Sequence, residues 1–277
     1  MTGAQLSADG VTRWLRWGGS LYEVAHPNEW QGLIGSWPFW RGAGATVEDV
    51  SGWNNHGTLT GYTDTNAAWQ RAPNQPHVQE FDGTDDYDAV ADSPSLSSVF
   101  ATDRITLSCW LKWNGTPAQY DTVASHTVST GWATGWGLYW TSSTALRFWI
   151  STYIGNGADV TVTPGAWNHI VGVYDHANVR IFANAVAGSA DPYANGITDG
   201  GAVVEIGRGR HNNYNLEGWL ADFRLYNRDW SFAEISTGYS HGSLSHLLLR
   251  RKATAIVGAV AVSGNRRRRV ICGACAI

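Results

Sequence analysis

Hydrophobic and polar residues alternate along much of this chain with the period of two that is typical of a half-buried β-strand. Residues 105–113 show the pattern most clearly, because Ile105, Leu107 and Cys109 share one face of such a strand. Cys109 lies in the middle of this apolar face, and we expect it to be a small buried core residue. No long stretch of helical periodicity precedes Phe232. The pattern therefore predicts a protein built mainly from strands.

Further segments of this kind follow at regular spacing and are separated by turn residues such as Asn114-Gly115 and Pro164-Gly165. The predicted strands are residues 33–39, 105–113, 122–125, 136–140, 146–151, 169–174, 179–183, 203–207 and 219–226. Pro38 inside the first of them indicates an edge strand or a bulge, because proline cannot donate a ladder hydrogen bond. Many short strands at this spacing predict an all-β, two-sheet antiparallel sandwich.

The two ends of the chain do not follow the strand pattern. We expect residues 1–30 to form an N-terminal arm that packs on the sandwich or on a neighbour. Residues 241–277 are a C-terminal tail with a basic cluster, an apolar β-branched stretch and four consecutive arginines. The tail cannot form a core by itself, so it is either flexible or ordered by a partner. No secretion signal is visible in residues 1–10, and the apolar stretch 253–262 is about half the ~20 residues that span a bilayer.

Composition and charge add two expectations. Charged residues make up only 15% of the chain and 16 residues are tryptophan, which favours an ordered protein with large cores or contact faces. The tail carries seven positive charges and no acidic residue, so the rest of the chain has a net charge of −11. An acidic body with a basic tail indicates either two separate roles or a tail that docks on an acidic surface. Cys272 and Cys275 form a lone Cys-x-x-Cys, which is half a zinc site at most; a terminal disulfide or idle thiols are the alternatives.

Three separated motifs carry a family resemblance. The first is a Gly- and Asn-rich turn at residues 49–59, the second begins with Phe-Asp-Gly at residues 81–87, and the third is residues 218–228. Together they resemble the signature of the laminin-G-like jelly roll, in the concanavalin A-like lectin/glucanase group. The resemblance covers roughly residues 31–240 and implies a jelly-roll sandwich for that range. Because this fold is usually a recognition surface and only sometimes an enzyme, function has to be argued from the site.

The resemblance pairs the first turn with the aspartate before the last strand. It implies that Asp49, Asn54 and Asp222 bind one Ca²⁺, which prefers carboxylate, amide and carbonyl oxygens. In the alternative interpretation, Asp49 bonds its own turn backbone and Asp222 faces solvent or an arginine.

A second acidic group lies beside Gly83. Its carboxylates belong to Asp82, Asp85, Asp86 and Asp88. A second cation site is one interpretation, and solvated turn carboxylates are the other.

Sugar binding is a further candidate function, because lectins stack sugar rings on aromatic faces and orient hydroxyls with a few polar groups. The candidate ligand-binding residues are Trp132, Trp136, Trp140, Trp149, Tyr153, His211 and Tyr214. Trp136 and Trp140 share one strand face, and Trp149 lies opposite to Phe148, so some of these side chains belong to the core. Alternatively, the aromatics fill a wide sandwich and a subunit interface.

Catalysis finds no support in the sequence. Related glucanases place two carboxylates on one strand face as Glu-x-Asp-x-Glu, and no such spacing occurs here. Glu205 and Glu217 stand alone in strand-like contexts. The four tail arginines could neutralise phosphates, but the body is acidic, so they are weak evidence for nucleic acid.

We therefore expect a non-catalytic recognition module that binds glycan or protein and is displayed on a particle or surface assembly. The alternative is a structural virion component, such as a capsid or tail decoration protein, that uses its arms for subunit contacts. In both cases the tail is predicted to mediate self-association or assembly. The candidate partner-binding residues are Arg250, Arg251, Arg266, Arg267, Arg268 and Arg269.

Overall fold

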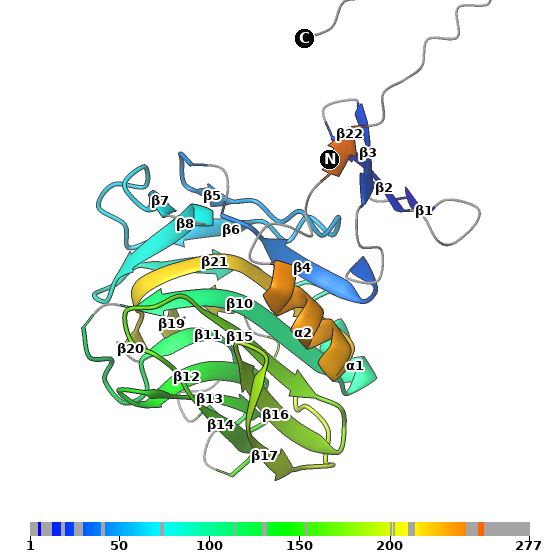
Figure 1. Cartoon of the computed structure of the whole chain (residues 1–277), viewed down its shortest axis with the longest axis vertical. Helices are drawn as coiled ribbons and strands as arrows, with labels where there is room; N and C mark the ends of the chain where they lie inside the picture. Colours follow the sequence, from blue (N-terminus) through cyan, green and yellow to red (C-terminus); the bar gives the residue numbers. More distant parts are fainter. Residues whose placement is uncertain are drawn as a thin grey trace, which may run out of the picture.

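The protein is a sandwich of two large antiparallel sheets, seen in a computed structural model (Figure 1). The structure describes residues 5–6, 13–17, 20–24, 30–39, 42–72, 75–113, 115–128, 132–152, 155–199, 201, 203–209, 214–241 and 249–251. Within these ranges, neither helix has the length and apolar character needed to cross a bilayer.

The first sheet is built around the long strands β10 and β21. Its order is β17 (Val186–Pro192), β16 (Asn178–Ala183), β15 (Asn168–Tyr174), β10 (Ile105–Trp113), β21 (Glu217–Tyr226), β8 (Gln75–Asp82) and β7 (Trp69–Ala72), and β4 (Leu33–Trp37) also pairs with β21. Among the described strands, β4 pairs with β21 alone, so its other edge has no partner strand in this sheet. This agrees with the edge position that Pro38 predicts, and β4 ends one residue before that proline.

The second sheet packs against the first. Its order is β14 (Gly157–Thr161), β13 (Ala145–Ile150), β12 (Trp136–Ser142), β11 (Thr122–His126), β18 (Val204–Ile206), β9 (Tyr87–Val90), β6 (Gly57–Thr60) and β5 (Thr46–Val47). A short pair, β19 (Arg208–Gly209) and β20 (Tyr214–Asn215), follows β18. The predicted all-β, two-sheet antiparallel fold is confirmed.

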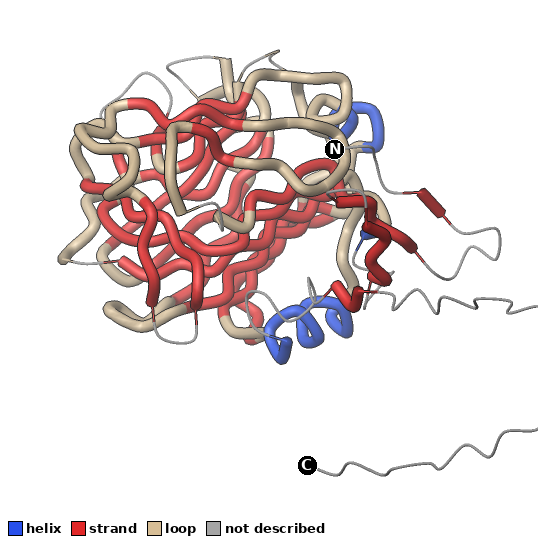
Figure 2. Tube along the Cα trace, turned by 90° about the horizontal axis from the view of Figure 1, so that it is seen from above, coloured by secondary structure: helices blue, strands red, loops and turns tan. Residues whose placement is uncertain are grey.

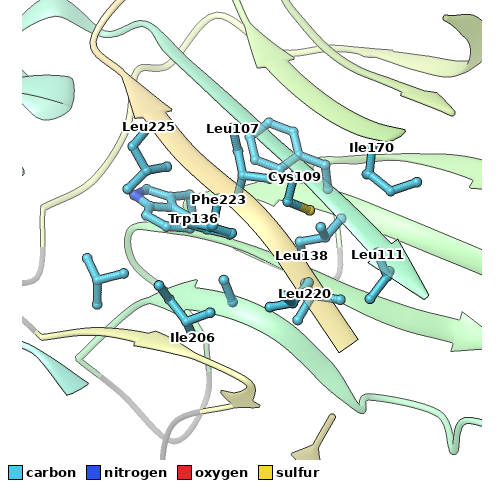
Figure 3. Close-up of a cluster of buried hydrophobic side chains, with 14 of the residues drawn as sticks. Leu107, Cys109, Leu111, Trp136, Leu138, Ile170, Ile206, Leu220, Phe223 and Leu225 are labelled. Carbon is cyan, nitrogen blue, oxygen red and sulfur yellow. The ribbon is translucent and has the colours of Figure 1, made fainter. Parts of the chain in front are cut away.

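The core lies between the two sheets, where the inward residues of each strand meet. Figure 3 shows Cys109 and Leu111 of β10 and Phe223 of β21 facing Leu138 of β12. Cys109 is fully buried, as its place in the alternating pattern predicts. Burying one large apolar side chain stabilises the fold by about 1.5–3 kcal/mol, so this layer is the main source of stability.

The helices lie outside the strands (Figure 2). They are α1 (Ser98–Thr102) and α2 (Phe232–His241). Ser231 and Glu234 cap the start of α2: the Ser231 N–H donates to the Glu234 carboxylate at 2.8 Å, and the Glu234 N–H donates to the Ser231 hydroxyl at 3.3 Å. Ile235 and the preceding Trp230 then pack on Val171 of the first sheet. The outer face of the first sheet is therefore covered in part by α2.

The two ends of the chain meet in a small separate sheet beside the sandwich (Figure 1). Its strands are β1 (Gln5–Leu6), β2 (Arg13–Trp17), β3 (Ser20–Val24) and β22 (Leu249–Arg251). β22 pairs with β3, which sets Arg250 opposite Glu23. Residues 249–251 of the tail thus pair with a strand of the arm of the same chain. Docking of the tail on another copy stays a prediction, and residues 252–277 lie outside the described ranges.

Candidate ligand-binding site

The second sheet carries a separate group of aromatic side chains on its outer face, which points away from the core. Trp140 of β12 points inward, so Tyr139 beside it lies outside. Phe148 of β13 points inward, so Trp149 lies outside. The outer aromatic cluster consists of Trp132, Tyr139 and Trp149, with Tyr120 and Tyr214 packed against them.

The base of the outer aromatic cluster is a pair of buried tryptophans. The rings of Trp132 and Trp149 are parallel within 3°, with centroids 6.3 Å apart. Trp149 lies flat on the sheet over Gly137, where an added Cβ would stand 2.5 Å from the indole nitrogen. Trp132 is 4% exposed and Trp149 1% exposed, so neither presents an open ring face.

Two tyrosines form the rim of the cluster. The rings of Tyr120 and Tyr214 lie 5.5 Å apart, and Tyr214 meets the Trp132 ring edge-on at 5.7 Å. Edge-to-face contacts of this kind are favourable and fix the relative orientation of the rings. Both tyrosines are half-buried, whereas the tryptophans beneath them are covered. Tyr120 and Tyr214 are therefore the part of the cluster that reaches the surface.

The backbone at this rim is strained. Tyr120 has a φ of 79° and Trp132 a φ of 46°. Bulky residues rarely adopt this left-handed region, and each instance costs on the order of 1–3 kcal/mol. Such conformations persist where the surrounding structure holds them, and they are concentrated at ligand-binding sites.

Polar groups flank the cluster on two sides. Next to Tyr120, Asp121 accepts a hydrogen bond from the Ala118 N–H at 2.7 Å. Burial raises the pKa of the Asp121 carboxyl, and the nearby Glu217 charge raises it further. On the other side, Arg147 forms a bidentate ion pair with Asp159 at 2.7 and 2.6 Å. Acceptors and donors thus lie beside aromatic rings.

The structure places the predicted ligand-binding residues in three groups. Trp132, Trp149 and Tyr214 lie together in the outer aromatic cluster. Trp136 and Trp140 are 1% and 0% exposed within the main core, and this corrects their prediction as ligand contacts, because their rings fill the space between the sheets. Tyr153 and His211 lie outside the described residues.

The sequence prediction missed two members of the cluster, Tyr120 and Tyr139. For Tyr139 the signal was present: it alternates with Leu138 and Trp140 on a strand predicted to be half-buried. Tyr120 lies in a loop before β11, where no periodicity indicates the direction of a side chain.

Asp49, the first predicted calcium ligand, accepts four hydrogen bonds from its own chain. Its Oδ1 accepts from the backbone N–H of Ser36 and of Ser51, each at 2.9 Å. Its Oδ2 accepts from the Asn55 N–H at 2.9 Å and from the Ser51 hydroxyl at 2.8 Å. Asp49 is 1% exposed, whereas Asn54 is exposed on the same turn. These contacts confirm the interpretation in which Asp49 holds its own turn.

Asp222 lies inside β21, not before it, at an irregular pairing with β10 where its φ is 52°. Its carboxylate forms a bidentate ion pair with Arg224 at 2.8 and 2.6 Å, and both side chains are buried. This confirms the alternative in which Asp222 faces an arginine. Calcium binding by Asp49, Asn54 and Asp222 together stays a prediction, which thermal melts with and without a chelator test.

Of the predicted partner-binding residues, Arg250 and Arg251 lie in β22. Arg266, Arg267, Arg268 and Arg269 lie outside the described ranges. Their role in assembly stays a prediction.

A second buried polar group lies under α2, on the outer face of the first sheet. Ser108 and His169 are joined by a hydrogen bond of 3.0 Å between Oγ and Nε2, and the Tyr239 ring stacks over His169. Burial, helped by the Arg224 charge, lowers the pKa of His169 to about 3.

This histidine is expected to make the fold acid-sensitive. The pKa of His169 is lower in the folded state than in the unfolded state. Neutral His169 therefore makes its full contribution to the free energy of unfolding above about pH 6.5. This contribution is lost as the pH falls, by up to ~1.4 kcal/mol per pH unit. His169→Gln retains a hydrogen-bonding partner for Ser108 and does not titrate. Chemical denaturation at pH 6.5 and 5.0 should show the wild type losing about 1.5 kcal/mol more than His169→Gln over this interval. Equal losses in the two proteins would contradict the assignment.

The two packed antiparallel sheets define the class of concanavalin A-like jelly rolls. A family model described as the concanavalin A-like lectin/glucanases superfamily, of laminin-G type, matches residues 82–236, which is more than half of the chain. The chain belongs to this family, and the predicted laminin-G-like resemblance is confirmed over residues 82–236, a range that includes the third motif at residues 218–228. No curated protein matches the chain in sequence.

Several solved structures have a similar fold and are distant in sequence. The binding domain of botulinum neurotoxin DC in complex with rat synaptotagmin II is 14% identical, with a TM-score of 0.57 over 76% of this chain and 51% of that chain. Domain 4 of AbnA, an extracellular arabinanase from Geobacillus stearothermophilus, in complex with arabinotriose, is 15% identical, with a TM-score of 0.57 over 74% and 97%. A botulinum neurotoxin type C structure, whose cell entry depends on two ganglioside molecules, is 15% identical, with a TM-score of 0.56 over 76% and 51%. The chain spans about half the length of the toxin chains it matches.

Proposed function

We propose that this protein is a non-catalytic glycan-binding module whose contact residues are Tyr120 and Tyr214. The observation that carries the proposal is the strained rim of the outer aromatic cluster, where Tyr120 is held at a φ of 79°. A bulky side chain in that conformation costs stability, and Tyr120 stays half-buried although its ring contacts those of Trp132 and Tyr139. Contact between the Tyr120 ring and a ligand would explain why a tyrosine occupies this strained position.

The chemistry of the rim suits a sugar. The C–H faces of a pyranose or furanose ring stack on aromatic faces, and the hydroxyls need a few fixed polar partners. Tyr120 and Tyr214 supply the rings, and Asp121 supplies an acceptor beside them. Trp132 and Trp149 beneath them hold the rings in place, which reduces the entropy lost on binding.

The comparisons support this class of function. Among structures with this fold are an arabinanase domain in complex with arabinotriose and a toxin whose cell entry depends on gangliosides. Both are distant in sequence, so they support the class of ligand and leave its identity to experiment. Display on a particle, and the alternative structural role in a virion, stay predictions.

The contacts of Glu205 support a non-catalytic role. The Glu205 carboxylate is buried and pairs with Arg208 at 2.6 Å, and the Arg208 guanidinium lies over the Tyr87 ring. Because the Glu205 carboxylate is buried and ion-paired with Arg208, it is a poor nucleophile or proton donor. Glu217 is exposed at the start of β21.

Binding to a panel of glycans tests the proposal. Arabinotriose, a ganglioside oligosaccharide, xylan, β-glucan, galactan and chitin oligomers would be measured by calorimetry against the wild type, Tyr214→Ala and Tyr120→Gly. Glycine at position 120 removes the ring and tolerates the left-handed backbone. We expect at least one glycan to bind the wild type and both variants to bind it roughly tenfold or more weakly, a change of about 1.4 kcal/mol.

Tyr239→Ala is the matched control, because this tyrosine is exposed on α2 at the other sheet. Its affinity should equal that of the wild type. Absence of binding across the panel would contradict the proposal. If the wild type hydrolyses a glycan of the panel and Glu217→Gln does not, the proposal that the module is non-catalytic is wrong.

A further inference from the structure

The turn between β8 and β9 gathers three carboxylates at one point. In the described part of the chain, one group of three potential metal ligands occurs, and it consists of Asp82, Asp85 and Asp86. One oxygen from each lies within 4.8 Å of the others. Oxygens on opposite sides of a calcium ion stand about 5 Å apart, since each bond is about 2.3–2.6 Å long. The three carboxylates therefore have the spacing of a calcium site.

Asn215 supplies an independent observation. It lies on β20, far from the turn in sequence, and is 4% exposed. Its side-chain amide donates a hydrogen bond to the Thr84 carbonyl inside the turn. The other end of the same amide, Oδ1, is buried and accepts no hydrogen bond. A buried oxygen without a partner costs about 1–3 kcal/mol, so a missing partner is expected beside it.

The local charge favours a cation as that partner. Glu217 stands opposite Asp82 in the register of β21 and β8, which adds a fourth acidic residue to the three in the turn. Among the described residues, none of these carboxylates forms an ion pair with a lysine or arginine. The ligand atoms are all hard oxygens, with no histidine or cysteine, which selects Ca²⁺ over zinc or copper.

We propose that the β8–β9 turn binds Ca²⁺ through the carboxylates of Asp82, Asp85 and Asp86 and the amide oxygen of Asn215. Water completes the six to eight oxygens that calcium prefers. The site is separate from the turn at Asp49, whose two carboxylate oxygens accept four hydrogen bonds from the chain. In the β8–β9 turn, Asp82 and Asp86 accept one backbone hydrogen bond each, which leaves the other oxygen of each carboxylate for an ion. It joins two segments that already touch, because the Gly83 N–H donates to the Leu216 carbonyl at 3.0 Å.

A bound ion would also fix the strand that carries Tyr214. Asn215 directly follows Tyr214 on β20, so fastening the amide holds the neighbouring ring at the rim of the outer aromatic cluster. The effect on Tyr214 matters only if the proposed glycan site is correct. The proposed metal site does not depend on it, because its ligands are in the turn and on Asn215. The experiment therefore uses calcium alone.

Calorimetric titration of the full chain with CaCl₂, after removal of metals with a chelator, tests the site. Asp85→Asn is the main variant, because Asp85 makes no hydrogen bond among the described residues and its loss should leave the fold intact. We expect the wild type to bind one calcium ion in this turn, and Asp85→Asn to bind it at least tenfold more weakly. Asn215→Ala should weaken binding as well, and Asn215→Asp, which keeps an oxygen ligand, should restore it.

Two controls identify the site. Asp199→Asn changes an exposed turn aspartate elsewhere, and Asn54→Gly alters the turn of Asp49 at a residue whose φ of 61° glycine accepts. Both should bind calcium at this site as the wild type does. No binding heat with the wild type would overturn the proposal. Binding that survives Asp85→Asn and is lost in Asn54→Gly would overturn it too, because the ion would then lie at the other turn.

Discussion

Replacing Asp49 with alanine is expected to lower the free energy of unfolding by about 4 kcal/mol. The carboxylate accepts hydrogen bonds from three backbone N–H groups, those of Ser36, Ser51 and Asn55, and all three residues are buried. Alanine leaves these donors without an acceptor in the folded state. Each unsatisfied buried donor costs about 1–3 kcal/mol, and partial relaxation or entry of water recovers some of the sum.

Urea denaturation of the wild type and Asp49→Ala measures this effect. Ser51→Ala is the control, because it removes one donor to Asp49 and leaves the three backbone donors of that carboxylate bound, although the Trp53 N–H loses its 3.3 Å contact with the hydroxyl. Its expected loss is about 1 kcal/mol. A loss below 1 kcal/mol for Asp49→Ala would show that the turn is not held by this carboxylate.

Replacing Arg224 with methionine is expected to cost about 3–5 kcal/mol. The variant removes the guanidinium that neutralises Asp222 within the first sheet, where both side chains are about 5% exposed or less. Breaking a buried ion pair from one side is strongly destabilising because the remaining charge has lost its compensation.

A second substitution separates the charge effect from lost packing. Asp222→Asn removes the charge, and asparagine tolerates the left-handed backbone at this position. In the Arg224→Met background it should recover at least half of the lost stability, measured as the coupling energy of a double-mutant cycle. A double variant as unstable as Arg224→Met alone would contradict a charge-based explanation.

The strands with a strong apolar alternation could be predicted from the sequence. Residues 105–113 were assigned with the bounds that β10 has in the structure, because one face is apolar along the whole segment. β17 was missed because it is exposed along its length and has no apolar face to produce a period. It forms as an edge strand through backbone pairing with β16, which sequence periodicity does not reveal.

The candidate sites were predicted only in part, for a similar reason. Alternation indicates which face of a strand a residue takes, and it separates Trp149 from Phe148 correctly. It does not indicate which segments meet across the sandwich. The contact of Asn215 with the turn at Thr84, and that of Tyr120 with Tyr214, join residues more than ninety positions apart. Both depend on the tertiary fold.

The central claim is that a glycan contacts the rim of the outer aromatic cluster. Ring-proton NMR of the full chain, titrated with the glycan of the panel that binds tightest, locates that contact directly. The signals of Tyr120 and Tyr214 should shift in proportion to saturation, and the ring of Tyr239 on α2 should not. Shifts confined to Tyr239 and the exposed Trp53, with Tyr120 and Tyr214 unchanged, would place the ligand elsewhere and contradict the claim.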